Sequence, residues 1–176
     1  IMALIVVIST ISNAASVGMT LSSNSKLKAG DTVTVTMSLG NIDAGNGIDT
    51  ITAELNYDKN VFETVETSNL IASNSWTPTY ASSTNMLTAV KNSKVTKGET
   101  VLTITLKVKS TLSVKSTTVT LKDIVVSGGR VQDGGTGDIN VNNASVTINA
   151  DSDAITKNEN TISNTTTTSN TTTNTT

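Results

Sequence analysis

The sequence predicts an all-β protein: a two-sheet antiparallel β-sandwich of about nine strands with a disordered C-terminal tail. Three observations support this fold class. Apolar and polar residues alternate with period two from Val17 to Ile148, short turn signals separate the alternating segments, and no stretch repeats apolar residues at helical spacing. One apolar face and one Thr-rich face per strand is the pattern that two packed sheets require, because each sheet is buried on only one side.

The clearest strand covers Thr32–Leu39, where odd-numbered residues are apolar and even-numbered residues are Thr or Ser. The same alternation predicts a strand over residues 50–57 and another over residues 101–108, with Leu102 facing inward and Val101 outward. Further strands are expected at Asn85–Val90, Thr117–Val126 and Ala144–Ile148. Turns are predicted at Lys28–Asp31, Asp43–Gly47, Lys97–Glu99 and Asp133–Gly135.

The two ends of the chain differ in composition from the middle. Residues 1–14 contain an apolar run, Met2–Ile11, followed by small residues up to Ala14, which is typical of a signal peptide and its cleavage site. Residues 15–149 form the predicted sandwich domain. Residues 150–176 are rich in Thr and Asn and lack the apolar side chains needed to fold, so they predict a disordered linker. We therefore expect a secreted or cell-surface protein.

Composition excludes several classes of function. The 176 residues include no His and no Cys, which rules out Ser-His-Asp and Cys-His nucleophiles, thiolate or imidazole zinc sites, and disulfides. The net charge is −2, and Arg130 is the only Arg, so no basic stripe predicts nucleic-acid binding. Nothing in the pattern of Glu residues indicates two opposed carboxylates. We expect no enzyme activity, no cofactor and no membrane-spanning helix in this chain.

Two weaker signals have competing interpretations. Trp76 and Tyr80 lie in a loop-like stretch, where they belong either to the core or to a small sugar-stacking platform; the core interpretation is favoured. Loop carboxylates and amides could bind Ca²⁺, but their spacing fits neither the EF-hand loop nor the Gly-rich nonapeptide repeat, and ordinary turn chemistry explains them better. These residues are Asp43, Asn46, Asp49, Asp133 and Asp138.

Three segments, in order along the chain, carry a family resemblance. Lys28–Val35 contains Gly-Asp followed by an alternating strand, Ala53–Glu63 contains Leu-Asn-Tyr-Asp-Lys-Asn-Val-Phe-Glu, and Lys97–Val108 leads from a Gly turn into another alternating strand. Together they resemble the cohesin domain, the module that holds dockerin-bearing enzymes on cellulosomal scaffolds. The Tyr-Asp segment is the most specific, and Asp58 is expected to cap the turn that follows it. The resemblance departs from the family at Lys59, where Pro is usual, and at Phe62, where Leu is usual.

The resemblance implies a nine-stranded jelly-roll sandwich that binds a dockerin-type protein module across one sheet face. The residues implied in partner binding are Thr50, Thr52, Glu54, Lys91 and Asn92. Lys91 places a base where the family carries an acid, which would change the choice of partner. Two alternatives remain: a module that binds polysaccharide directly, and a surface spacer or adhesin domain without a specific ligand. Scarcity of aromatic residues counts against the first of these.

Overall fold

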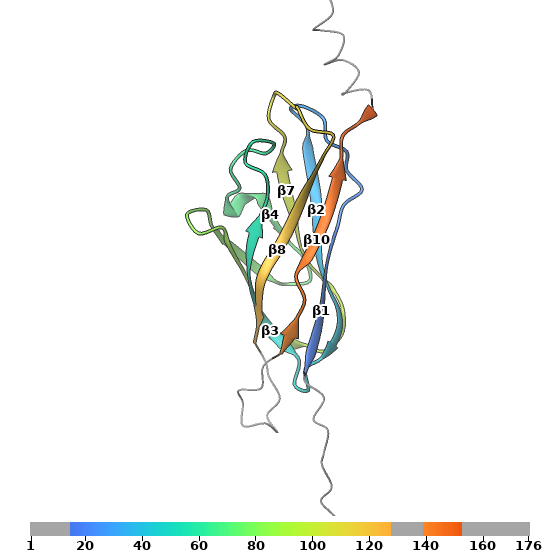
Figure 1. The fold of residues 1–176 in the computed structure, drawn as a ribbon. Coiled ribbons are helices and arrows are strands. Elements are labelled where there is room, and N and C mark those ends of the chain that lie inside the picture. The colour runs from blue at the N-terminus through green and yellow to red at the C-terminus, as the bar shows by residue number, and fades with distance from the viewer. Residues whose placement is uncertain (1–14, 128–138, 153–176) are drawn as a thin grey trace, which may run out of the picture.

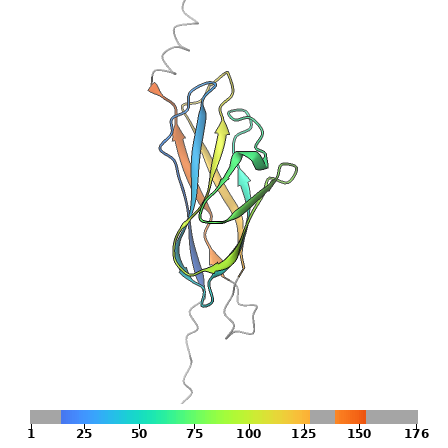
Figure 2. The same ribbon diagram turned by 180° about the vertical axis from the view of Figure 1, so that it is seen from behind.

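The structure is a computed structural model that describes residues 15–127 and 139–152, arranged as two packed β-sheets (Figure 1). The described segment begins at one end of the long axis and finishes at the opposite end, as the views from front and back agree (Figures 1 and 2). The predicted signal peptide at residues 1–14, the predicted turn at Asp133–Gly135 and residues 153–176 of the predicted linker lie outside the described residues.

The all-β prediction is confirmed. Nine strands of three or more residues, one two-residue strand and one short 3-10 helix make up the described chain. The strands are β1 (Ser16–Ser22), β2 (Thr32–Asp43), β3 (Ile48–Asn56), β4 (Leu70–Ala72), β5 (Thr77–Ala81), β6 (Met86–Val95), β7 (Thr100–Lys107), β8 (Ser116–Val126), β9 (Asn140–Val141) and β10 (Ala144–Asn149), and the 3-10 helix η1 is Thr67–Asn69.

One sheet has the strand order β4-β7-β2-β1-β9 and the other has the order β10-β8-β3-β6-β5. All pairs within them are antiparallel except β1 with β9. Hydrogen-bonded neighbours such as β2 and β7, or β3 and β8, are far apart in the sequence. From β2 onward, most consecutive strands lie in opposite sheets. This connectivity is that of the expected jelly roll.

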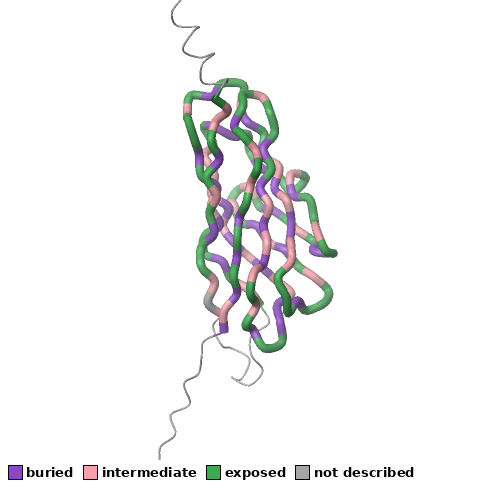
Figure 3. Tube along the Cα trace, turned by 90° about the vertical axis from the view of Figure 1, so that its right-hand side faces the viewer, coloured by how far each residue is buried: buried purple, intermediate pink, exposed green. Residues whose placement is uncertain are grey.

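The core lies between the two sheets and consists of the inward-facing residues of each strand (Figure 3). Along β2, Val33, Val35, Met37 and Leu39 are buried, as the period-two pattern predicts. On β7 the prediction was wrong at one position, because Val101 is buried beside Leu102. The β2–β7 register shifts between Met37 and Ser38, so a β-bulge turns two consecutive side chains inward.

The Tyr-Asp segment folds as a capped turn at the end of β3. Asp58 Oδ1 accepts a hydrogen bond of 2.8 Å from the Asn60 amide, which confirms the predicted cap. Tyr57 accepts one of 3.0 Å at its hydroxyl from the Val65 amide, and its ring meets the buried Phe62 edge-on at 6.5 Å between centroids. These contacts fix residues 57–65 across one end of the core.

A tight turn between β4 and β5 predicts one stabilising substitution. The turn is closed by a 3.0 Å bond from the Trp76 amide to the Ser73 carbonyl, and both central residues, Asn74 and Ser75, have positive φ. Glycine adopts positive φ without the steric cost that Ser75 bears. Ser75→Gly should therefore raise the free energy of unfolding by about 0.5 kcal/mol, measured by urea denaturation. Ser75→Ala is the control: a glycine variant no more stable than the alanine variant would contradict this.

Candidate docking surface

Four adjacent strands of the β3-containing sheet present their outward side chains on one side of the molecule. Cross-strand pairing defines which side chains are neighbours, because residues directly opposite each other share a face. We call this set the β3 face. It consists of Thr77, Thr79 and Ala81 on β5; Met86, Thr88 and Val90 on β6; Thr50, Thr52 and Glu54 on β3; and Lys122 and Val125 on β8.

The register arranges the β3 face in three rows across the strands. Thr52 lies in the middle row, paired with Thr88 of β6 on one side and with Val125 of β8 on the other. One row away along β3 lie Thr50, opposite Val90, and Glu54, opposite both Met86 and Lys122. Thr52 is thus surrounded by neighbours on both flanking strands and occupies the centre of the face.

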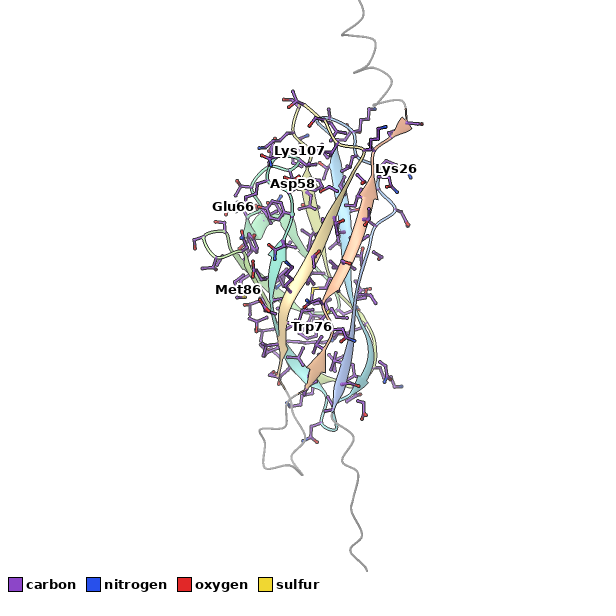
Figure 4. All side chains as sticks on the ribbon, viewed as in Figure 1. Lys26, Asp58, Glu66, Trp76, Met86 and Lys107 are labelled. Atoms are coloured by element: carbon purple, nitrogen blue, oxygen red, sulfur yellow. The ribbon has the colours of Figure 1, made fainter. Side chains whose placement is uncertain are left out.

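Three apolar side chains interrupt the Thr-rich pattern of the β3 face. Val125 is 63% exposed, Val90 42% and Met86 37%, and Figure 4 shows Met86 at the margin of the sandwich. They flank the Thr52–Thr88 pair from three directions. Exposed apolar groups beside hydroxyls form the mixed surface common at protein–protein interfaces, where apolar anchors lie within a polar surround.

Sequence reasoning missed Val125 because β8 changes its alternation. An unbroken period-two alternation, which buries Val119 and Leu121, would also bury Val125 and expose Ile124. Instead, Asp123 has a φ of +47°, and the β3–β8 register shifts between Thr52 and Glu54. Ile124 is consequently buried and Val125 points outward. The Lys122-Asp123 pair after an alternating run was a local signal of this bulge. Met86 and Val90 could have been placed by pairing their strand with β3.

The charges around the β3 face fall into two groups. Glu54 and Lys122 face each other across β3 and β8, and within the described residues neither forms a salt bridge. Beyond Thr50, Asp49 lies 3.3 Å from the Lys94 amine and accepts a hydrogen bond from Ser127. The bond from Ser127, with the added attraction of Lys94, holds the pKa of Asp49 below its ordinary value.

Lys91 is not on the β3 face. It lies two residues after Ala89 on β6, so it is on the same inward side of the strand as the buried Leu87 and Ala89. Its amine donates a hydrogen bond to Glu99 Oε1 at 2.7 Å. The same oxygen accepts a 2.6 Å bond from the Trp76 indole, and the Lys91 amine lies 5.8 Å from the Trp76 ring centroid. The structure thus brings Thr50, Thr52 and Glu54 together and separates Lys91 from them. Asn92 is exposed, two residues beyond Val90 on β6.

Trp76 and Tyr80 belong to the core, as the favoured interpretation held. They are 2% and 8% exposed, so they cannot form an exposed sugar-stacking platform. Figure 4 shows Trp76 within the outline of the sandwich. Burial raises the pKa of the Tyr80 hydroxyl, which lies 3.3 Å from Asn85 Oδ1.

Over residues 15–127 and 139–152, no three acidic, His or Cys side chains gather closely enough to bind a metal ion. Asp49 instead binds Lys94 and Ser127, whereas the loop carboxylates Asp133 and Asp138 lie outside this part of the chain. In the same residues, no helix has the length and apolar character required to cross a bilayer.

The two packed antiparallel sheets, with an outer face of hydroxyl and apolar side chains, define the chain as a jelly-roll β-sandwich module. The cohesin domain family model matches residues 17–149, and the chain belongs to this family. No curated protein matches the sequence.

Solved structures share the fold at low sequence identity. A cohesin module of a family 33 glycoside hydrolase from Clostridium perfringens is 13% identical, with a TM-score of 0.63 over 80% of this chain and 98% of that one. The seventh ScaB type I cohesin from Pseudobacteroides cellulosolvens is 19% identical, with a TM-score of 0.58 over 78% and 94%. A type I cohesin–dockerin complex from Clostridium thermocellum is 15% identical, with a TM-score of 0.55 over 76% and 99%.

Proposed function

We propose that this chain is a non-catalytic module that binds a dockerin-type partner through the β3 face. The observation that carries the proposal is the group of exposed apolar side chains, Met86, Val90 and Val125, around the central Thr52 on four adjacent strands. Membership of the cohesin domain family supports the choice of partner, because related structures include complexes with dockerins.

The dimensions of the β3 face suit a helical partner. Four strands at about 4.8 Å spacing cover about 14 Å, and the three rows cover about the same length along the strands. An α-helix is about 10–12 Å wide with its side chains, so one helix would cover the face over two to three turns. Its apolar side chains would then contact Val90 and Val125 on either side of the central Thr pair.

The predicted binding residues have different parts in this proposal. Thr50 and Thr52 provide hydroxyls and methyl groups at the centre of contact, Glu54 provides a charge at one end, and exposed Asn92 extends the surface along β6. Lys91 has its amine bound to Glu99, so we assign it the indirect role of holding β6 in place.

The sequence supports a location for this module outside the cell. The predicted signal peptide at residues 1–14 and the predicted Thr/Asn-rich linker support display outside the cell, where docking would attach this module to polysaccharide-degrading enzymes. Direct binding of polysaccharide is the weaker alternative, because the β3 face has no aromatic side chain among its residues and Trp76 is buried.

Thr52→Arg tests the docking role. A long cation at the centre of the β3 face would hold the partner away from Val90 and Val125 and lose its own hydration on contact. Calorimetric titration of the full chain against the dockerins of the same genome, with calcium present, should find a binder. The variant should weaken that binder by at least roughly 100-fold, or about 2.7 kcal/mol.

The matched control is Thr36→Arg, which places the same charge on the outward side of β2 in the other sheet. It should leave affinity unchanged, while circular dichroism verifies that both variants fold. If every dockerin in the panel fails to bind the unaltered chain, docking is excluded. Polysaccharide pull-down would then distinguish sugar binding from a spacer role.

A further inference from the structure

The β3 face has all its charge at one end. In the row that contains Glu54 and Lys122, β3 places a carboxylate and β8 an amine directly opposite each other. The middle row contains only Thr and Val side chains, and the row at the other end contains Thr50, Val90 and Thr77. From one end to the other, the surface therefore changes from a pair of opposite charges to hydroxyl and methyl groups.

Two ion pairs near this face are already formed, and exposed Asp123, in the bulge of β8 next to Lys122, lies toward the charged end of the face. Asp49 forms its 3.3 Å salt bridge with Lys94, and Lys91 its 2.7 Å salt bridge with Glu99. Glu54 and Lys122 form none within the described residues. They are therefore the charges on the β3 face that remain available to a partner, and each can still accept or donate several hydrogen bonds.

We propose that the Glu54–Lys122 row fixes the direction in which a partner helix lies on the β3 face. This inference rests on the proposed docking function and adds to it the charge pattern of the partner. The partner carries a cationic side chain opposite Glu54 and a carboxylate opposite Lys122, followed by apolar side chains that cover Val125 and Val90.

The physical reason is the cost of the reversed arrangement. A partner turned end for end would place apolar side chains on Glu54 and Lys122, which would lose water without gaining a hydrogen-bonding partner. Its own charges would meet Val90 and Thr50, at the end where the nearby charges of Asp49 and Lys94 are already paired with each other. Specificity of this kind comes from penalising the wrong arrangement as much as from favouring the right one.

The test reverses the two charges together. In Glu54→Lys/Lys122→Glu the net charge and the mutual attraction across β3 and β8 are kept, so the fold is little affected. Titrated against a dockerin that binds the unaltered chain, this variant should bind roughly 10- to 100-fold more weakly, because both contacts become like-charge contacts. The loss should shrink as salt rises, since charges at a surface are screened.

The matched control reverses another exposed pair, Lys28 and Asp31, whose side chains are 3.9 Å apart in the turn before β2. Lys28→Asp/Asp31→Lys should leave affinity unchanged. A dockerin carrying the two complementary charge reversals should recover binding to the Glu54→Lys/Lys122→Glu variant.

Three outcomes decide the matter. Weaker binding by the variant, restored by the reversed dockerin, supports the inference. If the Glu54→Lys/Lys122→Glu variant binds with unchanged affinity while Thr52→Arg still weakens binding, the inference is overturned and the docking function remains intact. Failure of the unaltered chain to bind any dockerin removes the docking function and this inference with it.

Discussion

Replacing Phe62 by Ala is expected to lower the free energy of unfolding by about 3–5 kcal/mol. The Phe62 side chain is 1% exposed and is among the largest that are fully buried. Its ring meets the Tyr57 ring edge-on, and its backbone pairs with Val108 beyond the end of β7. The loss of the ring leaves a cavity that the flanking sheets cannot close, because both are held by cross-strand hydrogen bonds.

The measurement is equilibrium unfolding in urea, comparing midpoints and slopes for the two chains. Phe62→Leu is the matched control, since it keeps an apolar side chain of similar volume and should cost less than about 1.5 kcal/mol. Equal destabilisation by Ala and Leu would show that the loss comes from the aromatic contact with Tyr57 and not from the cavity, contrary to this prediction.

Glu99→Ala is expected to destabilise the protein by about 2–3 kcal/mol, because its carboxylate has two partners that water reaches poorly. The side chains of Lys91 and Glu99 are 13% and 23% exposed. Removing the carboxylate leaves the Lys91 amine and the Trp76 indole nitrogen without the oxygen that both now contact. The partial exposure keeps the expected loss below that of a fully buried pair.

A double variant distinguishes the cost of an unpaired charge from the value of the pair. Lys91→Met/Glu99→Gln removes both charges, keeps a carbonyl oxygen for the Trp76 indole and preserves most of the packing volume. It should unfold within about 1 kcal/mol of the unaltered chain, because an ion pair gains little over an apolar replacement once desolvation is counted. A double variant as unstable as Glu99→Ala would contradict this interpretation.

The candidate site was only partly accessible to sequence reasoning. Thr50, Thr52 and Glu54 were placed on the outward side of their strand correctly, because β3 alternates without interruption over those residues. The family resemblance implies a partner-binding role for Lys91. In the structure it lies on the inward side of β6 and binds Glu99, which is eight positions away in the turn before β7. Sequence alternation does not reveal which charged side chain forms an ion pair with a residue on another strand or turn.

Six strands and most of the core residues on them could be predicted from the sequence alone. The short strands β4 and β5 could not, and β5 lies in the stretch of Trp76 and Tyr80 that the sequence predicts as loop-like. A strand turns alternate side chains to opposite sides, so the apolar set of β2 had to face the core in any sheet it joined. Tertiary pairing determined which outward residues became neighbours, and the bulges at Val101 and Asp123 determined where the alternation reverses. Those bulges depend on how strands distant in the sequence come into register. For this reason the Thr52 centre, the exposed Val125 and the charged Glu54–Lys122 row emerged only from the folded structure.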